Sequence, residues 1–126
     1  MNALHWRRIW LGASGVLGAA GVALAAAAAH LAAAGSGSNL ELAAQFLLIH
    51  ALALLGIAAV TRGHEKWLRV GGALFVLGSI CFSGGLCLIA LIGPGAGPMV
   101  PVGGTALILG WIVLAVSAFA DPPHLT

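Results

Sequence analysis

Four long apolar stretches constrain what this chain can fold into more than any other feature. They cover residues 9–31, 42–60, 67–91 and 99–120, and only short polar or Gly/Pro-rich pieces separate them. A bilayer core about 30 Å thick requires roughly 20 apolar residues for one helical crossing, and each stretch is close to that length. Backbone groups in lipid must bond within their own segment, so each stretch is predicted to be a helix. We therefore expect an all-α, polytopic membrane protein built as a four-helix transmembrane bundle.

The composition supports a lipid environment. Of the 126 residues, 61% are apolar and only 6% are charged, whereas a soluble domain carries about 25% charged residues. The length suits one integral membrane domain over residues 1–126. The net charge is +2 and there is no basic tract, so the lipid bilayer is an expected partner and nucleic acid is not.

The basic residues predict the orientation of the chain in the membrane. Arg7 and Arg8 precede the first stretch, and Arg62, Lys66 and Arg69 surround the second connection. Four crossings place these two regions on one side, and the positive-inside rule makes that side the cytoplasm. We expect a multi-pass protein of the cell (inner) membrane with both termini cytoplasmic. The aromatic belt expected at this boundary consists of Trp6, Trp10 and Trp67.

The first stretch allows a second interpretation. A basic start with Arg7–Arg8, an apolar run and Ala-x-Ala sequences are also typical of a cleavable signal, including a twin-arginine signal. The apolar run is longer than a typical signal core, which favours a retained helix.

Small residues are predicted to hold the helices together, because no hydrophobic force drives helices toward one another in lipid. In the first helix the expected packing positions recur every third residue, at Gly12, Gly15, Gly18 and Gly21. In the third helix they are Gly84 and Gly85, and the hydroxyls of Ser79 and Ser83 can bond to carbonyls one turn earlier. We interpret these residues as packing positions and not as a ligand site.

His50 lies near the expected midplane of the membrane. A neutral imidazole has one donor and one acceptor to satisfy, and we expect both to point at another helix. The favoured interpretation is a hydrogen bond between helices that sets the register of the bundle, and the alternative is a ligand or proton relay. Trp111 lies deep in the fourth helix, and its indole N–H needs an acceptor. His50 and a serine of the third helix are the candidates.

A soft-metal site is a weaker hypothesis. His30, His50, Cys87 and Met99 offer nitrogen and sulfur ligands in the outer half of the membrane or near its middle. No two of them have a metal-ligand spacing within one helix, and a single membrane histidine could also bind haem. We predict no cofactor. The polar pair at the outer end of the second helix, Glu41 and Gln45, is expected to cap it at the interface.

Three segments, "HALALL", "FSGGLCLIAL" and "PVGG" followed by "GW", resemble the small membrane-protein family labelled domain of unknown function DUF423 (UPF0382-like). The resemblance runs from about Gly12 to Ala118 and implies four helices and no established activity. It implies that two family histidines correspond to His30 and His50. It also implies that a family glycine pair and the tryptophan after it correspond to Gly103, Gly104 and Trp111, and we expect this glycine pair to be a helix-packing position.

The chain departs from this family in its hydroxyl groups. Phe46 and Ile49 stand where the family usually has tyrosines, and Gly85 and Cys87 stand where it has serine and tyrosine. The histidine, tryptophan and small-residue pattern that remains suits scaffolding better than catalysis. We therefore expect a structural or accessory membrane subunit, not an enzyme, that packs against itself or other membrane-protein subunits. The alternative is a protein that binds or transports a small ligand, metal or haem through His30 and His50.

Overall fold

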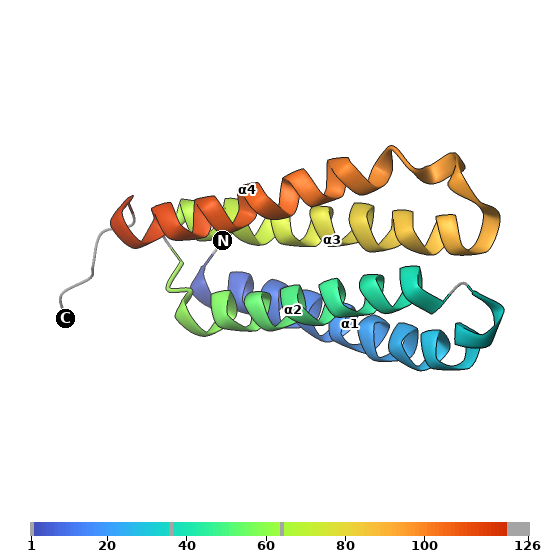
Figure 1. Cartoon of the computed structure of the whole chain (residues 1–126). Helices are drawn as coiled ribbons and strands as arrows, with labels where there is room; N and C mark the ends of the chain where they lie inside the picture. The colour runs from blue at the N-terminus through green and yellow to red at the C-terminus, as the bar shows by residue number, and fades with distance from the viewer. Residues whose placement is uncertain (1, 36, 64, 121–126) are drawn as a thin grey trace.

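The computed structural model describes residues 2–35, 37–63 and 65–120, and most of these lie in four long helices (Figure 1). The elements in chain order are α1 (Ala3–Leu31), η1 (Ala32–Ala34), α2 (Gly37–Val60), α3 (Lys66–Ile92), η2 (Pro94–Ala96) and α4 (Met99–Ala120). Each of the four α-helices is long and apolar enough to cross a membrane. The expected all-α transmembrane bundle is therefore confirmed.

Two helices begin before the apolar stretches that predicted them. α1 begins at Ala3 and not at residue 9, because the side chain of Asn2 accepts a hydrogen bond of 3.0 Å from the backbone N–H of His5. α2 begins at Gly37 and not at residue 42. Hydropathy locates the lipid-embedded part of a helix, whereas the polar turns at its ends depend on capping groups.

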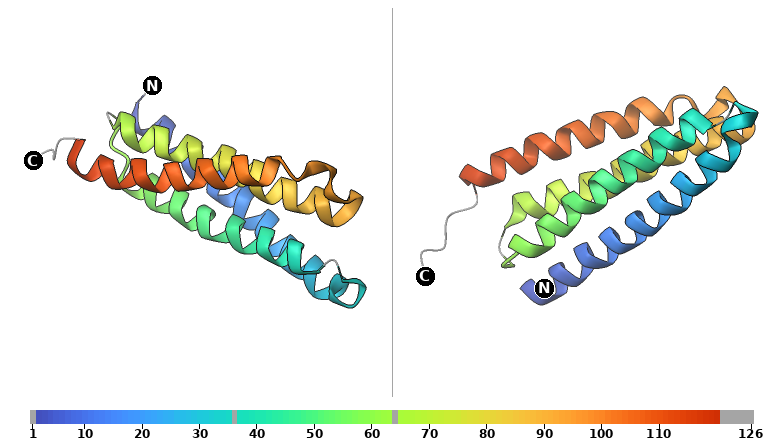
Figure 2. Two further views of the ribbon diagram at one scale, coloured as in Figure 1. Left: turned by 45° about the horizontal axis from the view of Figure 1, so that its top comes forward. Right: turned by 60° about the horizontal axis from the view of Figure 1, so that its bottom comes forward.

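The helices form two antiparallel pairs, α1 with α2 and α3 with α4, as expected for short connections. Figure 1 shows the two pairs as separate layers, and Figure 2 shows α1 and α4 on opposite sides of α2 and α3. Burial follows this arrangement: 44% and 33% of the apolar windows of α2 and α3 are buried, against 17% in each of α1 and α4. α2 and α3 are thus the central helices, and most of the surface of α1 and α4 is exposed in the described chain.

The basic end of the molecule holds the start of α1, the connection between α2 and α3, and the end of α4 (Figure 1). The Glu65 carboxylate accepts hydrogen bonds of 2.8 Å from the backbone N–H groups of Arg62 and Gly63 and so closes the connection. The Arg69 guanidinium lies 5.1 Å from the centre of a Trp6 ring, a cation–π arrangement.

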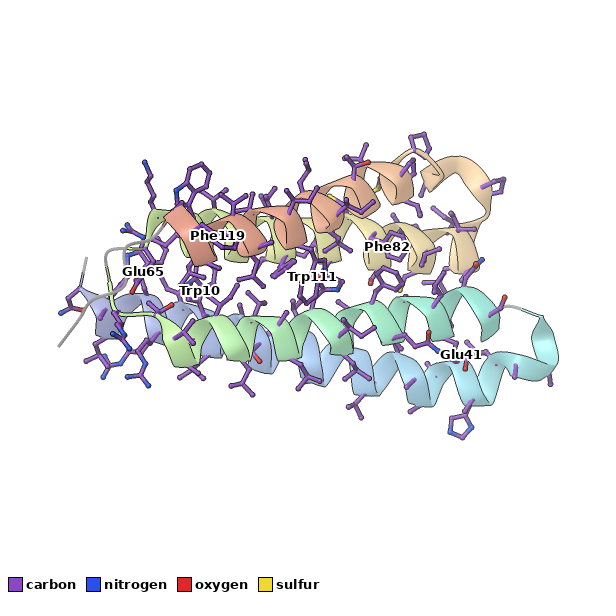
Figure 3. The ribbon with its side chains drawn as sticks, turned by 60° about the vertical axis from the view of Figure 1, so that its left-hand side comes forward. Trp10, Glu41, Glu65, Phe82, Trp111 and Phe119 are labelled. Atoms are coloured by element: carbon purple, nitrogen blue, oxygen red, sulfur yellow. The ribbon has the colours of Figure 1, made fainter. Side chains whose placement is uncertain are left out.

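Trp10 does not belong to the expected aromatic belt. Its side chain is only 4% exposed and is part of the core (Figure 3). A Cβ added at Gly72 would lie 2.8 Å from the Trp10 ring, so the glycine of α3 makes room for the indole of α1. Because Gly72 of α3 has no side chain, the Trp10 ring packs between the two helix pairs and not at the predicted membrane interface.

Candidate functional site

His50 is the most completely enclosed ionisable side chain in the membrane-spanning part of the structure. It is 3% exposed and lies near the middle of α2, roughly 20 Å along the helix from Gly37 at 1.5 Å per residue. Aromatic rings from three helices surround it: ring centres lie 5.9 Å away for Phe46 of α2, 5.2 Å for Phe75 of α3 and 5.9 Å for Trp111 of α4.

Both ring nitrogens of His50 have partners. Nδ1 lies 2.7 Å from the backbone oxygen of Phe46, one turn earlier in α2, and Trp111 Nε1 donates to Nε2 over 3.2 Å. A carbonyl only accepts and an indole N–H only donates, so the bonds require the neutral tautomer with its proton on Nδ1. The ring therefore joins α2 to α4 across the helix-pair boundary.

This geometry changes one expectation. Both polar atoms of His50 were expected to face another helix, but Nδ1 donates within α2 itself. The Phe46 carbonyl is available to a side chain one turn ahead, as the carbonyls of a helix are to serine and threonine. The bond to its own helix fixes the ring, and the fixed ring presents Nε2 to Trp111.

Trp111 reaches the histidine from a helix that mostly faces lipid. The side chain is 45% exposed, yet its N–H points inward to Nε2 of His50. Its ring centre lies 4.9 Å from that of the fully buried Phe75. Gly110 makes this approach feasible, because a Cβ there would lie 2.8 Å from the Phe75 ring. Gly110 and Phe75 were not singled out in the sequence, and the only signal was the glycine directly before Trp111.

Neither serine of α3 has the hydrogen bond to its own helix that the sequence allowed. Ser83 Oγ donates to the backbone oxygen of Ala43 in α2 over 3.0 Å. Ser79 is fully buried, and its Oγ has no hydrogen-bond partner among the described residues. A further bond of this kind, from Ser14 Oγ of α1 to the Ala51 oxygen of α2 over 2.8 Å, was missed.

The structure places three of the four expected soft-metal ligands in different surroundings. His50 uses both nitrogens within the chain, whereas the side chain of His30 is exposed near the end of α1. Met99 is 39% exposed at the first residue of α4. Within residues 2–35, 37–63 and 65–120, no three His, Cys, Asp or Glu side chains are grouped so that they could hold a metal ion.

Among the predicted packing glycines, one group meets a neighbouring helix closely. A Cβ at Gly21 would lie 2.8 Å from Leu48 Cγ, and one at Gly103 would overlap the backbone of Phe82. A Cβ at Gly85 would lie 2.9 Å from a side-chain carbon of Val100. The contacts at Gly18 and Gly104 are looser, with nearest atoms at 3.8 Å and 3.6 Å.

A second group has no close neighbour in the chain. A Cβ at Gly12, Gly15 or Gly84 would have no heavy atom within 4 Å apart from its own helix backbone and chain neighbours. These three glycines therefore meet no other helix of the described chain, and their role in helix packing stays a prediction. The tight positions Gly78 and Gly110, where a Cβ would lie 2.8 Å from Leu107 and from Phe75, were not predicted.

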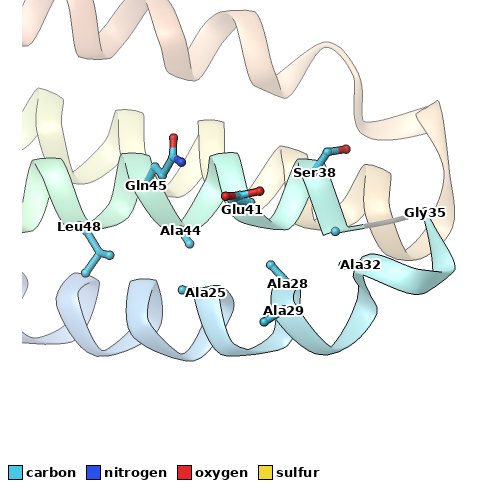
Figure 4. Close-up of a pocket in the computed structure, with 11 residues that line it drawn as sticks. Ala25, Ala28, Ala29, Ala32, Gly35, Ser38, Glu41, Ala44, Gln45 and Leu48 are labelled. Atoms are coloured by element: carbon cyan, nitrogen blue, oxygen red, sulfur yellow. The ribbon is translucent and has the colours of Figure 1, made fainter.

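An open groove of about 450 Å³ lies between α1 and α2 at the end opposite the basic residues (Figure 4). Its wall is mostly alanine, with Ser38, Glu41 and Gln45 as its polar side chains. All three are exposed. Glu41 and Gln45 thus line the groove and lie inside α2, which begins at Gly37, so the expectation that they cap this helix is wrong.

The chain is similar to several known membrane proteins that share the family name UPF0382. The chain is similar to the UPF0382 membrane protein of Haemophilus influenzae, with 29% identity over 60% of this chain and 61% of that protein. It is similar to the UPF0382 membrane protein SAB0533 of Staphylococcus aureus, with 34% identity over 63% of this chain and 66% of that protein. It is also similar to the UPF0382 inner membrane protein YgdD of Escherichia coli K12, with 34% identity over 59% of this chain and 58% of that protein.

The matched segment thus spans less than two thirds of each relative, and none of the three names specifies an enzymatic activity. No solved structure matches the chain. The family described as "Protein of unknown function (DUF423)" matches residues 24–104, from the second half of α1 to the first turns of α4. Because this match covers well over half of a chain that has four membrane-spanning helices, the protein belongs to the DUF423 family of membrane proteins.

Proposed function

We propose that this protein is a non-catalytic structural or accessory subunit of the membrane, which packs against itself or other membrane-protein subunits. The observation that carries the proposal is that both ring nitrogens of His50 already have hydrogen-bond partners within the chain. Three aromatic rings also enclose the imidazole. A ligand or proton at Nε2 has to displace the Trp111 N–H, so the arrangement favours holding α4 in register over exchanging a ligand.

Purification in a mild detergent tests this proposal. We expect a homo-oligomer or a stoichiometric complex with other membrane proteins, measured by size-exclusion chromatography with light scattering and by mass spectrometry. The same membranes without the expressed protein serve as the control for adventitious proteins. A monomer without any partner contradicts the proposal, and so does a stoichiometric metal or a haem absorption band that disappears in His50→Ala.

We further propose that both ends of the chain are cytoplasmic in the cell (inner) membrane. The five basic residues support this orientation, because they lie near the start of α1, in the connection between α2 and α3, and in the first turns of α3: Arg7, Arg8, Arg62, Lys66 and Arg69. A fluorescent protein fused after residue 126 is expected to be bright, and alkaline phosphatase fused there is expected to be inactive. The opposite pair of results contradicts the orientation, and the same reporters fused after Gly95 provide the control for the other side.

A further inference from the structure

Lys66 and Arg69 are two cations on one side of α3, at the end of the bundle that holds the connection from α2. They are the first and fourth residues of the helix, about 60° apart around it and about 4.5 Å apart along it. Each lies over an indole ring. The Arg69 guanidinium is 5.1 Å from the centre of a Trp6 ring, and Lys66 Nζ is 5.5 Å from the centre of a Trp67 ring. Aromatic contacts thus hold both cations in place.

No carboxylate in the described part of the chain neutralises these two cations. The described carboxylate at this end is that of Glu65, and its two oxygens accept hydrogen bonds from the backbone N–H groups of Arg62 and Gly63. Neither Lys66 nor Arg69 forms an ion pair with a described residue, and Arg69 donates one hydrogen bond, of 3.3 Å, to the Gly63 oxygen. A guanidinium has five N–H donors, so most of those on Arg69 are available to a ligand.

Two indole N–H groups in the same region also lack acceptors. Trp6, which Arg69 contacts, stacks on Trp10 with ring centres 5.7 Å apart, and Figure 3 shows Trp10 at the same end of the bundle as Glu65. Trp10 is only 4% exposed, and Nε1 of both indoles is buried without a hydrogen-bond partner among the described residues. A buried donor without an acceptor is costly. The unpartnered polar groups here are all donors, which favours an anion as the ligand.

The position of these residues along the helices identifies the source of the anion. Trp6 is the fourth residue of α1 and Lys66 is the first residue of α3, so both lie where a helix enters the membrane. Tryptophans at such positions lie at the level of the lipid headgroups, and long basic side chains near helix ends reach the same layer. Lipid phosphates occupy this layer, and a guanidinium can bind two phosphate oxygens at once.

We propose that Arg69 and Lys66 bind the phosphate of an anionic phospholipid in the leaflet at the basic end of the bundle. The Trp6 ring and the Gly63 oxygen position the guanidinium, and the Lys66 ammonium adds a second positive charge. Trp6 is half-buried, so a rotamer change can bring its N–H to the same phosphate. A zwitterionic lipid carries its own cation, which Lys66 repels. The site is independent of the proposed structural role, because it requires only that the helices cross a bilayer.

Native mass spectrometry of the full chain in detergent tests the site, with phosphatidylglycerol or phosphatidylcholine of identical acyl chains as the added lipid. Phosphatidylglycerol is expected to bind about fivefold more tightly. Arg69→Gln and Lys66→Gln are each expected to weaken its binding about fivefold. Arg8→Gln is the matched control, because it removes the same charge from an exposed residue that lies about 200° around α1 from Trp6. It is expected to change binding less than about twofold.

Three results overturn the inference. Equal binding of the two lipids removes the preference for an anionic headgroup. Equal losses in Arg69→Gln and Arg8→Gln show that only the overall charge matters. Displacement of phosphatidylglycerol from the unsubstituted protein by an excess of inorganic phosphate identifies a free anion, and not the lipid, as the ligand. Helical circular dichroism checks the fold of each variant. If Arg69→Gln does not fold, Lys66→Gln decides, because its side chain is exposed and its loss is not expected to impair folding.

Discussion

α1 and α4 occupy equivalent outer positions in the bundle, yet two glycines of each helix have opposite surroundings. In α4, Gly103 and Gly110 face α3 and are closed by the Phe82 backbone and the Phe75 ring. In α1, Gly12 and Gly15 face outward and have no neighbour within 4 Å. The same 17% of each helix window is buried, so the overall burial of a helix does not reveal the difference. A glycine in a membrane helix permits a close approach, but only the position of the neighbours decides whether the partner is in the same chain.

The largest effect on stability is expected at the glycines of α4 that contact α3. Gly103→Ala places a methyl group 2.7 Å from Phe82 Cα and 2.8 Å from the Gly78 oxygen, and both are backbone atoms that cannot turn away. We expect a loss of about 3 kcal/mol in the free energy of unfolding, at the upper end for an overpacked site. Steric trapping in detergent micelles or bicelles measures it.

Gly84→Ala is the matched control for this substitution, because its Cβ would meet no heavy atom within 4 Å. A change below about 0.5 kcal/mol is expected, as at other positions without close contacts. Equal losses of unfolding free energy in the two variants contradict the distinction between glycines that contact a neighbouring helix and glycines that do not.

The next effect concerns the bond between the two helix pairs. His50→Ala removes the acceptor of the Trp111 N–H and leaves a cavity between Phe46 and Phe75. We expect a loss of about 2 kcal/mol in unfolding free energy, which combines a lost bond with a cavity. The near-ultraviolet circular dichroism of the tryptophans is expected to decrease as well. Unchanged stability contradicts a structural role for His50.

Trp111→Phe isolates the hydrogen bond and is expected to have a smaller effect. It keeps an aromatic ring near Phe75 but removes the donor to His50 Nε2. The expected loss is about 1 kcal/mol, within the range of hydrogen bonds between membrane helices. In the double variant His50→Ala/Trp111→Phe, the two losses are expected to be less than additive because they remove the same bond. Full additivity shows that the two residues act independently.

The smallest effect separates the two serines of α3. Ser83→Ala removes the hydrogen bond to the Ala43 oxygen and is expected to cost about 0.6 kcal/mol, the average for such a bond in a membrane. Ser79→Ala is expected to be neutral or slightly stabilising, because its hydroxyl is buried without a partner among the described residues. Denaturation of both variants under identical conditions measures the difference, and a larger loss in Ser79→Ala reverses the assignment.

Part of the candidate site was readable in the sequence. His50 and Trp111 stand out as polar groups deep in apolar helices, and polar groups in lipid need partners. Pairing of Trp111 with His50 was one of two candidates. The bond from Nδ1 to the Phe46 carbonyl and the ring of Phe75 against Gly110 were not expected. They depend on side-chain rotation and on the distance between helices, which residue spacing within one helix does not contain.

By itself the sequence determined that the chain crosses the membrane four times as helices, because hydrocarbon offers no partner for backbone groups and about 20 residues span it. Only the tertiary structure decided which side of each helix is inside. In a soluble helix the apolar stripe marks that side, but a helix in lipid is apolar all round. The inward side of such a helix depends on which small residues another backbone approaches. The Phe82 backbone approaches Gly103, whereas no helix of the described chain comes within 4 Å of a Cβ at Gly15.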